Sequence, residues 1–185
     1  MRLGVYVGSF NPVHIGHIKL VNQLIEKKYL DKIYIIATKP YWNKDNLVPL
    51  QDRINMLKYF KTEDIIIDTY YNKYNYTYEI LNELKKNNPG DELYLIIGAD
   101  NLEKFHLWKN INEILKNKIL VLKRNNIDSS KYINNFKEKD NFVIANDVDE
   151  LNISSTEIRK NLDYGKKYLD KRVLKYIKSN NLYWR

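Results

Sequence analysis

His14 and His17, two of the three histidines in the chain, stand three positions apart in the segment GSFNPVHIGH, residues 8–17. This spacing is close to one helical turn, so a helix beginning here would present both imidazoles on the same side. Such a pair can ligate a metal, satisfy local hydrogen bonds within the fold, or donate hydrogen bonds to phosphate oxygens. Without an obvious third ligand nearby, a His-x-x-His pair is weak support for a metal site.

The residues around the histidines favour phosphate binding. Gly8 lets the backbone approach a ligand closely, because it has no side chain, and Gly16 leaves room between the histidines for a bulky group. A loop that leaves a strand and opens a helix exposes backbone N–H groups at the positive end of the helix dipole, which attracts anions. The segment lacks both the Gly-Lys-Ser/Thr ending of a P-loop and the Gly-x-Gly-x-x-Gly dinucleotide fingerprint.

The elements that must position this segment follow from the apolar pattern, in which runs of strand length alternate with helical periods. Strands are predicted at residues 2–7, 32–38, 64–68, 92–98, 118–124 and 141–146. Helices are predicted at residues 18–25, 50–60, 77–86, 107–117, 154–162 and 166–179. The polar stretch 124–141 is predicted to be an irregular excursion.

Strands that are apolar on both faces and alternate with helices predict a Rossmann-like α/β fold, with helices on both faces of a mostly parallel sheet. Ligands in such folds bind beyond the carboxyl ends of the strands, at the switch point of the strand order. The segment 8–17 follows the first strand and so lies at one of these ends. A length of 185 residues, 44% of them hydrophobic, with no repeat or linker, predicts one domain covering residues 1–185.

Composition limits the function classes. The chain has no cysteine, which excludes a thiol nucleophile, thiolate zinc sites and a disulfide scaffold. With no apolar stretch long enough for a bilayer and no secretory signal, we expect a cytoplasmic protein without membrane contact. The basic residues that give the net charge of +8 are interspersed with acidic residues, and this mixture favours solubility. The net positive charge can also attract a polyphosphate or nucleic acid. No long basic run supports nucleic acid, so a nucleic-acid-binding α/β module is the alternative and not the prediction.

Two segments far apart in the chain carry a family resemblance. GSFNPVHIGH resembles the first signature of the nucleotidyltransferase superfamily with the His-x-Gly-His motif, and ISSTEIR at 153–159 resembles its second signature. Between them, KPYWNK, NYTYEILNEL and LIIGADNLEKFHLWKNINEIL are similar to segments of nicotinate-nucleotide adenylyltransferases. Some members carry a second glycine and an aspartate where Val7 and Asn11 stand, so this chain has one candidate fewer for an indirect Mg²⁺ contact.

The resemblance implies adenylyl transfer from ATP to nicotinate mononucleotide, giving nicotinate adenine dinucleotide and pyrophosphate. The mononucleotide phosphate would attack in line without a covalent enzyme intermediate, and Mg²⁺ would arrive with ATP and not in a dedicated protein cage. His17 would contact the α-phosphate and Arg159 the β- or γ-phosphate, with His14 and Lys44 as further catalytic residues. The implied ATP-binding set is Gly8, Ser9, Phe10, His14, His17, Ile153, Ser155 and Arg159.

On the acceptor side, the resemblance implies that Trp108 stacks on the pyridine ring, Thr77 binds its carboxylate and Asp100 binds a ribose hydroxyl. Plainer alternatives are a core position for Trp108 and helix caps for Thr77 and Asp100. A solvated side chain is the alternative for Lys44, and a surface ion pair for Arg159. Ser154 is predicted to form a capping box with Glu157. Nicotinamide mononucleotide remains open as acceptor, phosphopantetheine is disfavoured by the GADNL…W segment, and the oligomeric state is left open.

Overall fold

The computed structural model describes residues 1–39, 47–124, 126–149 and 153–183. Within these ranges, six strands form one parallel sheet in the order β3-β2-β1-β4-β5-β6. They cover Arg2–Gly8 (β1), Lys32–Ala37 (β2), Ile65–Ile67 (β3), Glu92–Gly98 (β4), Lys118–Leu122 (β5) and Phe142–Ala145 (β6). The predicted strands and the predicted mostly parallel α/β fold are confirmed.

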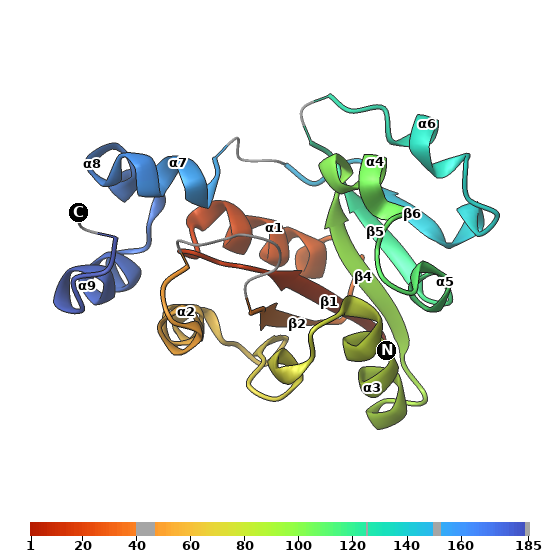
Figure 1. Cartoon of the computed structure of the whole chain (residues 1–185), viewed down its shortest axis with the longest axis horizontal. Coiled ribbons are helices and arrows are strands. Elements are labelled where there is room, and N and C mark those ends of the chain that lie inside the picture. Colours follow the sequence, from red (N-terminus) through yellow and green to blue (C-terminus); the bar gives the residue numbers. More distant parts are fainter. Residues whose placement is uncertain (40–46, 125, 150–152, 184–185) are drawn as a thin grey trace.

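Helices cover both faces of the sheet (Figure 1). They span Ile15–Glu26 (α1), Leu50–Leu57 (α2), Thr77–Asn87 (α3), Leu102–Phe105 (α4), Ile111–Ile114 (α5), Ser129–Ile133 (α6), Ser155–Lys160 (α7), Leu162–Gly165 (α8) and Lys171–Ser179 (α9). Short 3₁₀ helices lie at Lys58–Phe60, Tyr71–Lys73, Ala99–Asn101, Lys139–Asn141 and Lys166–Tyr168. In the described part of the chain, no helix combines the length and the apolar character that crossing a bilayer requires.

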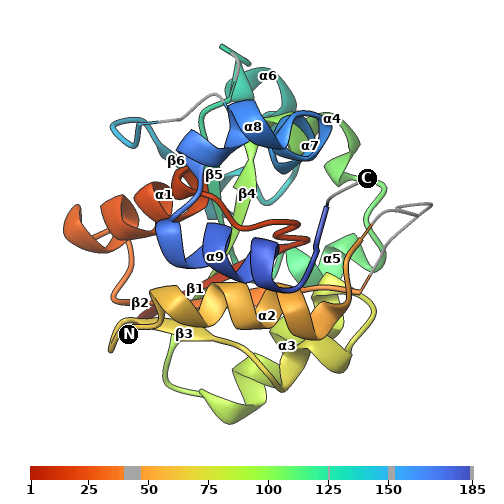
Figure 2. The same cartoon turned by 90° about the vertical axis from the view of Figure 1, so that its left-hand side faces the viewer.

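Alternating strand residues build a separate core on each face of the sheet. In β4, Leu93, Leu95 and Ile97 belong to the core beneath α3, α4 and α5, whereas Ile96 belongs to the core beneath α1, α2 and α9. Because both faces are covered, the central strands are apolar at nearly every position, which is why they can be found from sequence. Figure 2 shows α9 lying along α2, where the Tyr176 hydroxyl donates to Asp52 at 2.8 Å.

Two predicted segments differ from the structure. The helix predicted at 107–117 is wrong in its first part, because Asn110 adopts a left-handed conformation with φ of 51° and α5 begins only after it. Asparagine adopts this conformation more readily than most residues, so it breaks the helical pattern. The stretch 124–141 is not wholly irregular, because it contains α6, whose N-terminus is capped by Asp128 accepting from the Ser130 N–H.

The strand order creates a crevice at one edge of the sheet. The chain passes from β1 outward to β2 and β3, then returns to the other side of β1 to form β4, β5 and β6. The loops after β1 and β4 therefore leave the sheet in opposite directions at neighbouring positions, and a gap opens beyond the carboxyl ends of these two strands.

Candidate active site

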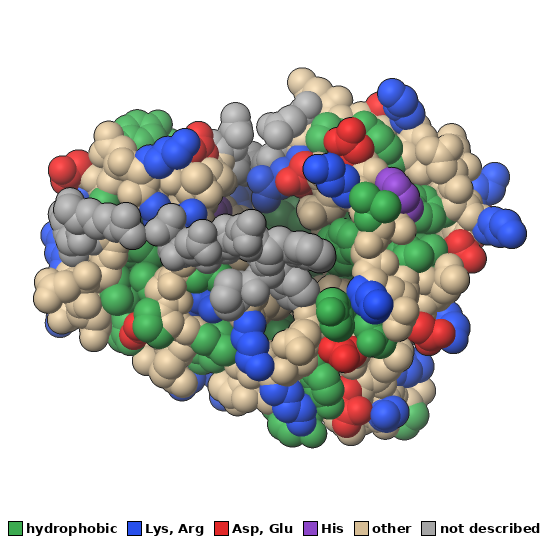
Figure 3. Space-filling view, in the orientation of Figure 1, with side chains coloured by type: hydrophobic (Ala, Val, Ile, Leu, Met, Phe, Trp, Pro, Cys, Tyr) green, Lys and Arg blue, Asp and Glu red, His purple; other side chains and the backbone are tan. Residues whose placement is uncertain are grey.

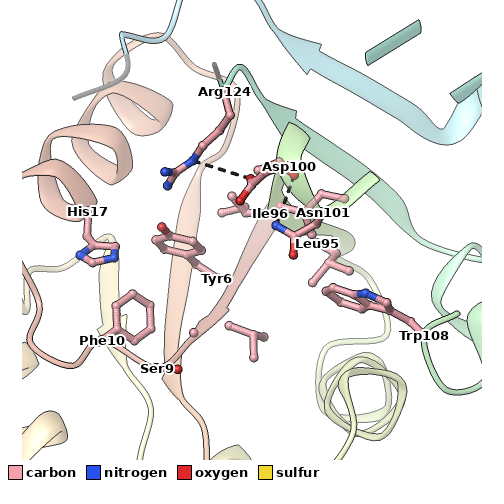
Figure 4. Close-up of a pocket in the computed structure, with 14 residues that line it drawn as sticks. Tyr6, Ser9, Phe10, His17, Leu95, Ile96, Asp100, Asn101, Trp108 and Arg124 are labelled. Carbon is pink, nitrogen blue, oxygen red and sulfur yellow. Dashed lines mark hydrogen bonds and ion pairs between the residues drawn. The ribbon is translucent and has the colours of Figure 1, made fainter. Parts of the chain in front are cut away.

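A pocket occupies this crevice (Figure 4). We call it the switch-point pocket. It is lined by residues 6–10 and 95–98 together with His17, Asp100, Asn101, Trp108 and Arg124. The structure therefore brings the first predicted motif and two predicted acceptor-side residues to one cavity.

His14 and His17 form a closely packed pair at the start of α1. Their ring centroids are 3.7 Å apart, and the backbone N–H of His14 donates to Nδ1 of His17 at 3.2 Å. Because Nδ1 of His17 accepts this bond, the proton of the neutral ring lies on Nε2. His17 thus presents an N–H donor to the pocket that it lines.

Both imidazoles are neutral at physiological pH. Burial, together with the positive charge of Arg124, lowers the pKa of His14 to about 4. Burial, His14 and Arg124 together hold the pKa of His17 well below its ordinary value. The pair can therefore donate hydrogen bonds without adding charge. In the described part of the chain, Nδ1 of His14 is buried without a hydrogen-bond partner, which disfavours a purely structural role for this ring.

The low pKa of His14 predicts an acid-sensitive fold. In the unfolded chain His14 takes up a proton near its ordinary pKa of 6.5, but in the folded protein only near 4. The unfolded state therefore binds more protons between these values, and the free energy of unfolding falls as the pH falls through this window. We expect His14 to account for about 2 kcal/mol of the loss between about pH 7 and pH 5.

Urea unfolding at the two pH values measures this loss. The variant His14→Gln should lose less stability on acidification than the unmodified protein. The matched control His106→Gln changes an exposed histidine and should keep the full loss. Equal losses in all three proteins would contradict the assignment to His14.

The second motif holds the β1–α1 loop, residues 9–14, through Ile153, Ser155 and Arg159, which do not line the switch-point pocket. The Ser155 hydroxyl donates to the Pro12 carbonyl at 2.8 Å, and Nη1 of Arg159 donates to the Asn11 carbonyl at 2.6 Å. Ile153 lies against Gly16, where an added Cβ would be 3.3 Å from its Cγ2. The two predicted signatures, separated by more than 130 residues of chain, therefore meet in space.

Sequence reasoning missed three further residues that support this loop: Arg53, Val48 and Tyr183. The buried guanidinium of Arg53 donates through Nη1 to the Ser9 and Thr38 carbonyls, both at 2.7 Å, and through Nε to the Val48 carbonyl at 3.1 Å. The buried Asn11 amide oxygen accepts from the Tyr183 hydroxyl at 2.8 Å and from the Val48 N–H at 3.2 Å. The position of Arg53, four residues before the inward-facing Leu57 on α2, was the available signal.

Gly8 and Gly16 of the first motif leave space for other side chains of the same motif, Phe10 and His14. A Cβ on Gly8 would lie 3.1 Å from the Phe10 ring, and one on Gly16 would lie 3.0 Å from the His14 ring. The expectation that Gly16 leaves room for a bulky group is therefore corrected: the space is filled by His14 and Ile153.

The other predicted residues are distributed as follows. Asp100 and Trp108 line the switch-point pocket, and Asp100 Oδ1 lies 3.8 Å from Nε of Arg124. Thr77 begins α3 outside this lining, and the residue that caps this helix is Tyr76, so a capping role for Thr77 is wrong. Ser154 does cap α7, as predicted, with its side chain accepting from the Glu157 N–H. Lys44 lies outside the described residues.

Comparison with known proteins agrees with these features. The family model described as cytidylyltransferase-like matches residues 5–161. A probable nicotinate-nucleotide adenylyltransferase of Flavobacterium psychrophilum is 35% identical, with 99% of each chain covered, and one of Azobacteroides pseudotrichonymphae is 36% identical, with 97% and 98% covered. The chain belongs to the nicotinate-nucleotide adenylyltransferase family.

The fold of this adenylyltransferase family member also matches a solved structure. The nicotinic acid mononucleotide adenylyltransferase of Plasmodium falciparum, complexed with NaAD, superimposes with a TM-score of 0.82 at 21% identity, covering 98% of this chain and 97% of that one. The predicted family, the predicted α/β nucleotidyltransferase fold and the predicted enzyme class are confirmed. The two signatures that meet at the β1–α1 loop both lie within the matched residues 5–161.

Proposed function

We propose that this adenylyltransferase joins ATP to nicotinate mononucleotide, giving nicotinate adenine dinucleotide and pyrophosphate in NAD biosynthesis. The observation that carries the proposal is the switch-point pocket. It has the Nε2–H of His17 and the β1–α1 loop on one side, and Asp100 and Trp108 on the other. A donor-rich wall suits a triphosphate, and an aromatic ring with a carboxylate suits a nucleoside.

The reaction needs positioning more than proton transfer. An oxygen of the mononucleotide phosphate forms a bond to the α-phosphorus of ATP, while the bond from that phosphorus to the bridging oxygen breaks and its electron pair leaves with pyrophosphate. The attacking phosphate is already an anion, so no general base is required. Catalysis then consists of aligning two polyanions and stabilising the charge on the α-phosphoryl oxygens.

On the ATP side, we assign the donor of the α-phosphate to Nε2 of His17, with Gly8, Ser9 and Phe10 bringing the backbone to the ligand. Arg159, Ser155 and Ile153 contact the same loop without lining the switch-point pocket, and we propose from the second signature that they bind the β- and γ-phosphates or the adenosine. His14 fixes the tautomer of His17 through its backbone N–H. Lys44 completes the catalytic set proposed from sequence.

Mg²⁺ is the cofactor we propose, carried by the ATP phosphates. Among the described residues, no group of three His, Cys, Asp or Glu side chains is arranged to hold a metal ion, so phosphate oxygens would supply most ligands. Asp100, at the rim of the pocket, is the acidic residue in its lining. The bound ion would neutralise charge on the phosphates during transfer.

On the acceptor side, we propose that Trp108 stacks on the pyridine ring, Asp100 binds a ribose hydroxyl and Thr77 binds the carboxylate. Trp108 is half-buried and packs edge-on against Phe105, with ring centroids 5.0 Å apart, so part of its ring remains accessible from the pocket. Trp108 thus packs against the core on one side, as the alternative predicted, and lines the pocket on the other. The same chemistry with nicotinamide mononucleotide is the second candidate.

We further propose that residues 1–185 act as one nucleotidyltransferase domain, because both signatures are needed to build the β1–α1 loop. The alternative of a nucleic-acid-binding module requires a continuous basic face. On the face seen in Figure 3, the described lysines and arginines are interspersed with aspartates and glutamates, which favours a small-molecule substrate over nucleic acid. We keep the proposal of a cytoplasmic enzyme from the sequence.

Pyrophosphate release tests the proposal. The protein is mixed with Mg-ATP and either nicotinate or nicotinamide mononucleotide, and the release rates are compared with a mixture lacking acceptor. We expect release with nicotinate mononucleotide at a rate above that with the amide. No release with either acceptor would overturn the proposal, and faster release with the amide would reverse the assignment of the acceptor.

A further inference from the structure

Tyr6 is a polar group of the switch-point pocket that no role above uses. It lies on β1, two positions before the loop, and its side chain lines the pocket. Figure 4 shows its hydroxyl directed toward the gap between the His17 ring and the Arg124 guanidinium. The hydroxyl therefore faces the same space as Nε2 of His17.

The ring of Tyr6 is held firmly. It packs edge-on against Phe10, with centroids 5.3 Å apart at 82°, and lies 6.3 Å from the His17 ring. Its backbone is in the middle of the sheet, paired with Ile35 on β2 and Ile96 on β4. The hydroxyl is thus positioned by a central strand that is paired on both sides, and a donor directed at a reacting group requires such a support.

The hydroxyl carries its proton under working conditions. Burial raises the pKa of Tyr6 to about 12, although the charge of Arg124 acts in the opposite direction. A phenol in this state donates a hydrogen bond and cannot serve as a base near neutral pH. The ligand that it fits therefore offers a hydrogen-bond acceptor, such as a phosphoryl oxygen.

Arg124 adds charge to the same space. Its Nε faces Asp100, with 3.8 Å to Oδ1, and Figure 4 shows its terminal nitrogens directed to the side of Tyr6 and His17. A neutral imidazole, a phenol and a guanidinium then converge from three elements: α1, β1 and the end of β5. Three donor groups, one of them positively charged, suit the negatively charged non-bridging oxygens of a phosphoryl group.

We propose that the Tyr6 hydroxyl is a hydrogen-bond donor to the α-phosphoryl group of ATP, acting beside His17 and Arg124 during transfer. The inference rests on the proposed function for the identity of the phosphoryl group. It assigns a catalytic contact to a strand residue outside both signature motifs. The donor is fixed before ATP arrives, so its bond strengthens as charge develops on the phosphoryl oxygens.

The variant Tyr6→Phe tests the proposal by removing one oxygen. We expect kcat to fall about tenfold or more, with a smaller change in KM, because the lost bond is strongest in the transition state. The matched control is Tyr94→Phe, on the adjacent strand, whose hydroxyl donates to Glu92 outside the pocket lining. It should retain kcat within about twofold, the scale of a surface change.

A second readout separates a phosphoryl contact from a structural effect. ATP in which sulfur replaces one α-phosphoryl oxygen exists as two isomers, and the unmodified protein should prefer one of them. Tyr6→Phe should change this preference, whereas a merely destabilised protein would keep it. An unchanged preference and a kcat within twofold of the unmodified protein would overturn the proposal, and so would a loss of kcat accompanied only by a lower melting temperature.

Calorimetric binding of Mg-ATP makes the test independent of the acceptor. We expect Tyr6→Phe to bind ATP about threefold more weakly, a smaller effect than the loss of kcat, because the bond is weaker before charge develops on the phosphoryl oxygens. If the unmodified protein turns over neither mononucleotide, the proposed function fails, and equal ATP affinities of the two proteins would then overturn the role of Tyr6 as well.

Discussion

The variant His17→Ala should lower kcat by about two to three orders of magnitude, because it removes an N–H donor aimed at charge that develops in the transition state. The donor is defined by the structure, since the other ring nitrogen accepts from the His14 backbone. KM for ATP should change much less. Pyrophosphate release under saturating substrates measures the effect.

The same change should cost little stability. The His14 N–H loses its acceptor at the start of α1, a loss comparable to a missing helix cap of about 1 kcal/mol. The control His106→Ala removes an exposed histidine outside the pocket lining and should change neither kcat nor stability. A large drop in melting temperature with near-normal turnover would favour the structural interpretation of the histidine pair.

Arg53→Met should produce the largest loss of stability among single changes near the site. The Arg53 side chain is 1% exposed and donates to three backbone carbonyls from three segments, those of Ser9, Thr38 and Val48. Methionine fills a similar length but leaves these acceptors without their donor. We expect the free energy of unfolding to fall by about 2 to 4 kcal/mol, measured by urea denaturation.

A matched control distinguishes this network from charge removal in general. Arg172 is exposed on α9, where it pairs with its near neighbour Asp170 and its guanidinium lies over the rings of Tyr59 and Phe60. Arg172→Met should therefore lower the free energy of unfolding by about 1 kcal/mol or less. Arg53→Lys keeps the charge but lacks the planar fork that reaches several carbonyls, and it should recover only part of the loss. Full recovery with lysine would show that charge, and not the set of three bonds, matters at this position.

Most of the fold was predictable because both faces of the sheet are covered. Runs such as KIYIIA and ELYLIIG have no solvent face to interrupt them, so strands β2 and β4 stand out from the polar sequence around them. The segment after β4 was not predictable in detail, because whether Asn110 adopts a left-handed conformation depends on its surroundings and not on its type alone.

Of the candidate site, the contact between the two histidines could be predicted, because these residues are close together in the sequence. His14 is the N-cap of α1 and His17 lies in its first turn, so their pairing follows from their spacing of three residues. Spacing could place Arg53 on the inward face of α2 but could not name its partners. The partners of Arg53 and Asn11 are backbone carbonyls, a hydroxyl and an N–H group that only the folded chain brings near. Tyr6 was hidden for another reason: within an apolar strand, a tyrosine looks like any core residue.

The residues that support the β1–α1 loop also determine when this loop can fold during synthesis of the chain. Pro12 and Asn11 are held by partners 143 and 148 positions later in the chain, and the amide of Asn11 by Tyr183, 172 positions later. During synthesis the sheet can therefore begin to form around β1 long before the C-terminal partners of the β1–α1 loop have been made. A nascent chain stalled before residue 153 would carry both histidines of the site together with Arg53 and Val48, and would still lack Ser155, Arg159 and Tyr183.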